Sequence, residues 1–158
     1  MIFVTVGMHS AGFDRLIRAM DKIASQIDEP VVMQIGSTSY QPQHAEFFRF
    51  ASYEEMQDFN RQSRLVVCQA ATSILTALEQ GTPVIAVPRQ KRYGEHIDDH
   101  QVEFAQALSK LIGIKVILNV DDLEPDLISE ATMPRLLPGT YKKQLVGAIK
   151  SYIQEIAK

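Results

Sequence analysis

The chain has 158 residues, with 16 Lys and Arg against 19 Asp and Glu, which gives a net charge of -3 at pH 7. This length indicates one domain of ordinary size, and the acidic balance provides no general attraction to nucleic acid. A single cysteine, Cys68, excludes an internal disulfide, and no apolar stretch approaches the roughly 20 residues that span a bilayer. We therefore expect a cytoplasmic protein that does not bind nucleic acid.

Short apolar runs alternate with helical patterns along most of the chain. Runs rich in β-branched residues predict buried strands at 2–6, 31–35, 46–50, 65–68, 83–87 and 115–118. Apolar residues spaced three or four apart predict helices at 13–27, 53–60, 72–80 and 98–111. Ser52 and Glu55 match the capping box at the start of the second of these helices. The alternation predicts an α/β fold, with a parallel Rossmann-like sheet and helices on both faces.

The end of the chain has a different pattern. Residues 124–140 contain Pro125, Pro134 and Pro138 and are predicted to be a connector. Residues 141–158 have apolar side chains on one face of a predicted C-terminal amphipathic helix. That face either completes the core or contacts a partner, and the pattern does not distinguish the two.

The segment Gln69-Ala70-Ala71-Thr72-Ser73 lies between a predicted strand and a predicted helix. The free N–H groups and the positive end of the helix dipole would favour a phosphate there, and the two hydroxyls add further donors. Thr and Ser are also ordinary helix caps, so both interpretations stay open. The chain has neither a GxGxxG nor a GxxxxGK[ST] motif, which excludes a typical dinucleotide fingerprint and a P-loop.

A polar cluster at residues 95–101 opens the next predicted helix. Asp99, His100 and Gln101 lie at the helix start, where they either contact a ligand or face solvent. His96 and His100 are four residues apart, as in a helical metal pair, but the pattern offers no third ligand. We expect no metal site here.

Two loops add candidate residues at the carboxyl edge of the predicted sheet. His9 follows the first strand and is either a catalytic base, a sugar contact or an exposed loop histidine. Residues 89–92 include Arg89, Lys91 and Arg92, which could supply positive charge to a diphosphate or to an acidic partner surface at a membrane.

Together these segments resemble a known family. The opening IFVTVGMHSAGFDRLIRAMD, the segment RFASYEEM and the long segment ILTALEQGTPVIAVPRQKRYGEHIDDHQ are similar to the small subunit of two-component UDP-sugar glycosyltransferases. The resemblance extends over about residues 1–123. Such subunits resemble the C-terminal half of MurG-type, family 28 enzymes, and they serve bacterial exopolysaccharide and eukaryotic lipid-linked oligosaccharide synthesis.

The resemblance implies that residues 1–158 form one nucleotide-sugar-binding domain, equivalent to the C-terminal half of a GT-B glycosyltransferase. It implies a UDP-sugar as donor substrate, transfer of GlcNAc or a related hexose to a lipid-linked sugar acceptor, and no further cofactor. A membrane-associated subunit would supply the N-terminal half and hold the chain peripherally at the membrane. The length agrees with this division, because a two-domain enzyme needs more residues.

The resemblance also assigns site residues. The expected substrate-binding residues are Gln69, Ala71, Thr72, Ser73, Thr76, Arg89, Asp99, His100 and Gln101. The catalytic base is expected to be His9, near the first strand, or a residue of the partner. The sequence departs from the family at residues 69–73, where Gln69 stands in place of the usual His and Ala and Thr replace glycines. In the predicted helix that follows, Thr76 stands where MurG-type enzymes have a ribose-binding Glu. These departures favour an alternative, a non-catalytic binding or scaffold subunit with a degenerate donor site. A generic nucleotide-binding regulator is a third reading of the fold.

Overall fold

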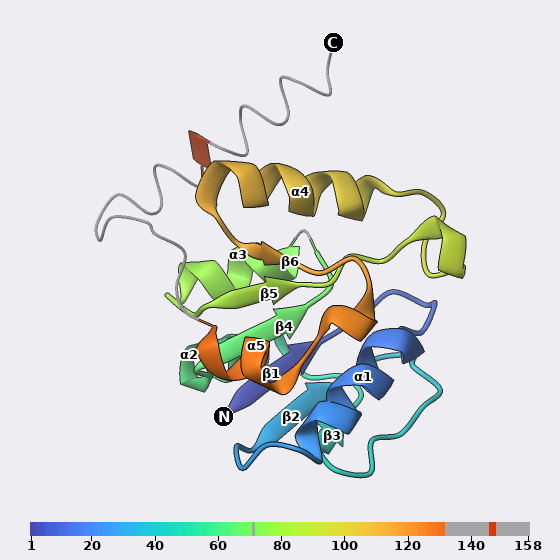
Figure 1. The fold of residues 1–158 in the computed structure, drawn as a ribbon, viewed down its shortest axis with the longest axis vertical. Helices are drawn as coiled ribbons and strands as arrows, with labels where there is room; N and C mark the ends of the chain where they lie inside the picture. The colour runs from blue at the N-terminus through green and yellow to red at the C-terminus, as the bar shows by residue number, and fades with distance from the viewer. Residues whose placement is uncertain (71, 132–145, 148–158) are drawn as a thin grey trace.

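The computed structural model describes residues 1–70, 72–131 and 146–147. These residues form a parallel sheet in the order β3-β2-β1-β4-β5-β6 (Figure 1). The strands are β1 (Ile2–Thr5), β2 (Val31–Gln34), β3 (Glu46–Phe48), β4 (Leu65–Cys68), β5 (Val84–Ala86) and β6 (Lys115–Val116). The helices are α1 (Asp14–Ala24), α2 (Tyr53–Gln62), α3 (Thr72–Glu79), α4 (His100–Ile112) and α5 (Pro125–Glu130), with the 3-10 turns η1 (Lys91–Tyr93) and η2 (Val120–Asp122).

The sheet grows outward from its centre in two directions. β1 pairs in parallel with β2 on one side and with β4 on the other. The chain therefore builds β1, β2 and β3 towards one edge and then returns to build β4, β5 and β6 towards the other. In an open α/β sheet, ligands bind outside the carboxyl ends of the strands where the order reverses in this way, which here is between β1 and β4.

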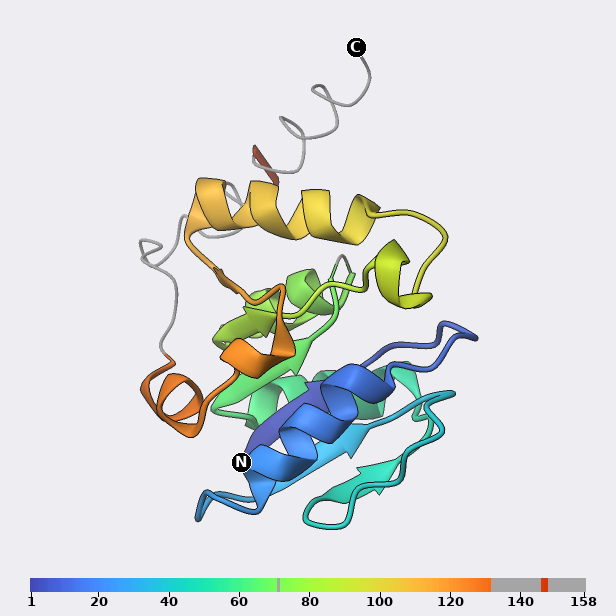
Figure 2. The ribbon, with the colours of Figure 1, turned by 45° about the vertical axis from the view of Figure 1, so that its right-hand side comes forward.

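Each face of the sheet is covered by helices, as the alternation of strands and helices predicts (Figures 1 and 2). Neighbouring residues of a strand point to opposite faces. Val4 packs in the core under α1 and α5, together with Leu16 and Ile128. Phe3 packs in the other core, formed with α2, α3 and α4, together with Ile74. The predicted α/β fold is therefore confirmed, including the capping box of Ser52 at the start of α2.

The predicted connector differs from the structure in its first half. Residues 125–130 form α5, and Ile128 of this helix is fully buried against the core under α1. Pro125 lies in the first turn of α5, where the missing N–H breaks no helical hydrogen bond. The proline that suggested a loop therefore marks a helix start. The rest of the connector and the predicted C-terminal helix at 141–158 lie outside the described residues, apart from the exposed pair at 146–147.

Candidate functional site

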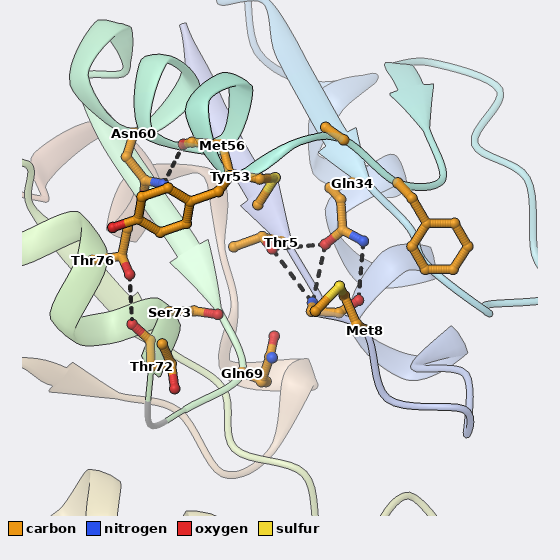
Figure 3. A pocket seen from close by; sticks show the side chains of 13 residues that line it. Thr5, Met8, Gln34, Tyr53, Met56, Asn60, Gln69, Thr72, Ser73 and Thr76 are labelled. Atoms are coloured by element: carbon orange, nitrogen blue, oxygen red, sulfur yellow. Dashed lines mark hydrogen bonds between the residues drawn. The ribbon is translucent and has the colours of Figure 1, made fainter.

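A pocket of about 390 Å³ opens at the carboxyl edge of the sheet, beside the strand-order reversal (Figure 3). Its walls come from the ends of β1 and β2, the loop between β1 and α1, the segment from the end of β3 into α2, and the first half of α3. The described lining residues are Thr5, Gly7, Met8, Gln34, Phe50, Ala51, Tyr53, Met56, Asn60, Gln69, Thr72, Ser73 and Thr76. None of these residues carries a charged side chain.

Gln34, at the end of β2, holds two of the pocket loops together. Its Oε1 accepts hydrogen bonds from Thr5 Oγ1 at 2.8 Å and from the backbone N–H of Gly7 at 3.0 Å. Its Nε2 donates to the carbonyl oxygens of Gly7 at 3.0 Å and Arg49 at 2.8 Å. Gln34 was not among the predicted site residues, although a single amide in the apolar strand VVMQI was an available signal, because a buried amide requires partners.

Gly7 and Gln69 fit closely against each other at the inner end of the pocket. Gly7 has φ of +68°, and a Cβ built on it would lie 2.3 Å from Gln69 Nε2. A residue with a side chain would therefore be strained there in its backbone and would clash with the amide. Gln69 is buried, and its Oε1 has no hydrogen-bond partner among the described residues.

The first half of α3 brings three more predicted residues into the pocket. Thr72 and Ser73 line it from the first turn of the helix, and Thr76 lines it one turn later (Figure 3). The Thr76 hydroxyl donates a hydrogen bond of 3.0 Å to the Thr72 carbonyl oxygen. The structure thus places Gln69, Thr72, Ser73 and Thr76 around one cavity, whereas Ala71 lies outside the described residues.

Arg89 does not line the pocket, contrary to its predicted role as a substrate contact. The side chain is only 1% exposed. Its Nη1 donates to the carbonyl oxygens of Ala11 at 3.0 Å and Gly12 at 2.9 Å, and its Nη2 donates to that of Val6 at 3.1 Å. Burial lowers the pKa of Arg89, an effect that the nearby charge of Glu95 opposes. The guanidinium is therefore occupied in fixing the loop between β1 and α1.

Asp99 and Gln101 also hold backbone in the described structure. Asp99 Oδ1 accepts the N–H of Lys91 at 2.8 Å, and Gln101 Oε1 accepts the N–H of Arg89 at 3.1 Å. The His100 side chain is exposed, with Nδ1 lying 3.4 Å from a carboxylate oxygen of Glu103. None of the three predicted contacts in this cluster is among the described lining residues of the pocket.

A buried ion pair, which the sequence analysis did not assign, fixes the same loop from α1. Arg15 donates from Nε to Glu95 Oε1 at 2.8 Å and from Nη2 to Oε2 at 2.9 Å. The Arg15 guanidinium also donates to the carbonyl oxygens of Pro88 and Leu118, and Glu95 accepts the N–H of Gln90 at 3.0 Å. Such bidentate, charge-assisted contacts are directional, so the loop has a defined position on α1.

His9, the predicted base, is exposed on the loop that also carries the pocket residue Met8. Its Nδ1 accepts the N–H of Ala11 at 3.1 Å, and its ring lies 5.2 Å from the ring of His96, centre to centre. His96 Nδ1 in turn lies 3.0 Å from Asp98 Oδ1. Among the described residues, no group of three or more His, Cys, Asp or Glu side chains is arranged to hold a metal ion.

The family of the chain follows from its sequence. A model of the glycosyltransferase family 28 C-terminal domain matches residues 1–147. The chain belongs to this family. No match was found among curated protein sequences.

Solved glycosyltransferases share the fold of this family 28 domain. The glycotransferase of kitacinnamycin is similar at a TM-score of 0.60 and 16% identity, covering 82% of this chain and 33% of that one. The calicheamicin glycosyltransferase CalG4 has a TM-score of 0.60 at 18% identity, covering 99% of this chain and 44% of that one. MurG from Acinetobacter baumannii has a TM-score of 0.52 at 20% identity, and the match covers 81% of this chain and 39% of that one.

The family 28 domain thus spans less than half of each of these solved structures. The described part of the chain contains no helix that is long and apolar enough to cross a membrane. What the structure describes is one Rossmann-like sheet of the GT-B type, with a neutral pocket at the edge where such sheets bind ligands.

Proposed function

We propose that the chain is the donor-binding half of a glycosyltransferase that moves a hexose, GlcNAc or a related sugar, from a UDP-sugar to a lipid-linked acceptor. The observation that carries this proposal is the pocket at the start of α3, in a domain of family 28. A nucleotide bound there would have its phosphates near the helix N-terminus, which favours negative charge.

The leaving group in this reaction is UDP, on which negative charge develops as the bond to the sugar breaks. The described lining residues provide no cation, so this charge would be stabilised by the start of α3 and the hydroxyls of Thr72 and Ser73. Two cations were predicted to add positive charge, and neither lines the pocket. Arg89 is buried, and Lys91 is exposed outside the pocket lining.

The remaining part of the active site would belong to a separate, membrane-associated subunit that provides the N-terminal half and holds the chain at the membrane. The exposed apolar side chains of the carboxyl edge support this proposal. Met8 and Ile97 are 83% and 81% exposed, and Phe50 and Tyr53 are also exposed beside the pocket. An apolar rim of this kind is typical of a surface that a partner covers. The base that deprotonates the acceptor would be His9 or a residue of that partner.

Calorimetric titration of the full chain tests the donor site. We expect heat on addition of UDP-GlcNAc or UDP-glucuronate and of UDP, and none on addition of ADP. Absence of heat with every UDP compound, both for the chain alone and for the chain with its partner half, would reject the proposal.

A non-catalytic scaffold is the second candidate, and the loop after β4 favours it, because Gln69 stands where a His is usual and Ala and Thr add side chains where glycines would let a diphosphate approach the backbone. On this view, replacing Ala70 and Ala71 by glycine would create donor binding that the natural chain lacks. Sugar transfer by the natural chain with its partner would exclude the scaffold role.

A further inference from the structure

Asn60 lines the pocket at its end between α2 and α3 and has an unusual hydrogen-bonding state. The side chain is 2% exposed. Its Nδ2 donates a hydrogen bond of 2.6 Å to the carbonyl oxygen of Met56, one turn earlier in α2 (Figure 3). Its Oδ1 is buried and has no partner among the described residues. Rotating the amide by half a turn would bring the two oxygens together, so the hydrogen bond to Met56 fixes the orientation. Asn60 therefore presents an unpartnered acceptor, Oδ1, beside the second N–H of its amide.

Other side chains of the pocket share this acceptor character. The Thr76 hydroxyl lines the same pocket as Asn60 and uses its proton on the Thr72 carbonyl oxygen, so only its lone pairs are free. The hydroxyl of Thr5 likewise donates to Gln34 Oε1. Gln69 Oε1 is a second buried oxygen without a described partner. A buried acceptor that lacks a partner destabilises the folded chain, so these atoms point to a ligand that brings donors.

The electrostatics of the pocket limit what that ligand group is. The described lining residues include no Lys, Arg or His, so no cation offsets the repulsion between a phosphate oxygen and the oxygens of Asn60 and Thr76. The start of α3, with Thr72 and Ser73, lies one turn of helix away from Thr76 and supplies donors, as do the side-chain N–H groups of Gln69. A phosphate is therefore favoured at the start of α3 and disfavoured beside the oxygens of Asn60 and Thr76.

We propose that Asn60 is a specificity-determining residue whose Oδ1 accepts a hydrogen bond from an uncharged N–H or O–H group of the ligand, seated between α2 and α3. The inference rests on the proposed function, and it adds the chemistry that selects the ligand: a neutral group rich in donors, either the base of a nucleoside or a sugar, with Thr76 as a second acceptor.

Titration of the full chain with uridine, N3-methyluridine, N-acetylglucosamine, pyrophosphate and UDP-GlcNAc tests this assignment. Asn60→Leu keeps the approximate shape and removes the acceptor. We expect this substitution to lower the affinity for UDP-GlcNAc and for one neutral fragment by about ten-fold, and to leave the affinity for pyrophosphate unchanged. If the base is the group read, N3-methyluridine binds the wild type more weakly than uridine does, and Asn60→Leu removes that difference. If Asn60 instead contacts the sugar, Asn60→Leu lowers the affinity for N-acetylglucosamine.

Gln62→Leu, at the exposed end of the same helix and outside the pocket lining, is the matched control and should bind like the wild type. If Asn60→Leu does not fold, Asn60→Ala removes the same oxygen from a smaller side chain, and Thr76→Val, at a half-buried position with nearly the same shape, tests the second acceptor. Wild-type affinity for UDP-GlcNAc in the folded variants would overturn the inference and leave the proposed function intact. A wild-type chain that binds no UDP compound and no neutral fragment would reject both.

Discussion

Arg15 and Glu95 lie 80 residues apart in sequence and form a bidentate ion pair, with N–O distances of 2.8 and 2.9 Å, that joins α1 to the loop before α4. Both side chains are largely buried. The pair therefore links the two halves of the sheet across the strand-order reversal. The loops at the carboxyl edge of the sheet are held by side-chain hydrogen bonds, some to backbone atoms and some to other side chains.

Replacing Glu95 by Gln should destabilise the chain. The substitution keeps the shape but leaves the buried Arg15 guanidinium without its counter-charge, and we expect the free energy of unfolding to fall by about 3 kcal/mol. Urea denaturation measures this change. Asp58→Asn, which breaks the exposed pair of Asp58 with Arg61, is the control and should have little effect. Equal effects of the two substitutions would contradict the structural role of Glu95.

Gly7→Ala should disturb the pocket through Gln69. The added Cβ would clash with Gln69 Nε2, and the backbone conformation disfavours alanine, so we expect a loss of about 1–3 kcal/mol in unfolding free energy. Gln69→Ala in the same chain removes the clash but not the backbone strain. The double variant should therefore recover part of the loss. A thermodynamic cycle in which the two changes simply add would show that the side chains do not meet.

Arg89→Lys should loosen the loop between β1 and α1. A lysine ammonium cannot reach the carbonyl oxygens of Val6, Ala11 and Gly12 in the planar arrangement that the guanidinium uses. We expect faster hydrogen exchange of the backbone amides in residues 7–12 and an unfolding free energy lower by about 2 kcal/mol. Exchange in β3, which Arg89 does not contact, serves as the internal reference. Unchanged exchange in the loop would indicate that Arg89 does not hold it.

The acid stability of the chain should depend on Glu29. A hydrogen bond from the Arg64 side chain lowers the pKa of Glu29 from 4.5 to about 2. Because the folded-state pKa is depressed, the stabilisation is present above pH 4.5 and is lost as the pH falls from about 4.5 to about 2. Glu29→Gln should reduce the slope of unfolding free energy against pH in this window. The same slope in the variant would assign the acid sensitivity to other carboxylates.

The sheet was predictable because its strands are short apolar runs and its helices have clear periodicity, signals that are local in sequence. α5 was not, because Pro125 is compatible with both a loop and a helix start, and only the burial of Ile128 against the core distinguishes them. That Gln69, Thr72, Ser73 and Thr76 lie around one cavity follows from a single segment at the start of one helix, and their contact with a substrate stays a prediction. The burial of Arg89 was not predictable, because it depends on carbonyl oxygens far away in sequence.

Asn60, Gln34 and the pair of Arg15 with Glu95 were missed for a related reason. Gln34 and the ion pair contact segments that are distant in the chain, and a single sequence does not give those distances. Asn60 bonds within its own helix, and only its burial distinguishes it. Asn60 in particular lies in the polar stretch YEEMQDFNRQ, where nothing distinguishes it from its exposed neighbours.

The neutral lining of the pocket has a consequence for how ionic strength acts on the protein. Interactions between uncharged donors and acceptors are almost insensitive to added salt, whereas the attraction of a diphosphate by exposed cations is screened within about 10 Å at 0.1 M. Raising the salt concentration should therefore leave affinity for a neutral ligand group unchanged while it weakens any contribution from exposed residues such as Lys91 and Arg92. The slope of affinity against salt would then separate the part of the donor held inside the pocket from any part held by charged residues outside its lining.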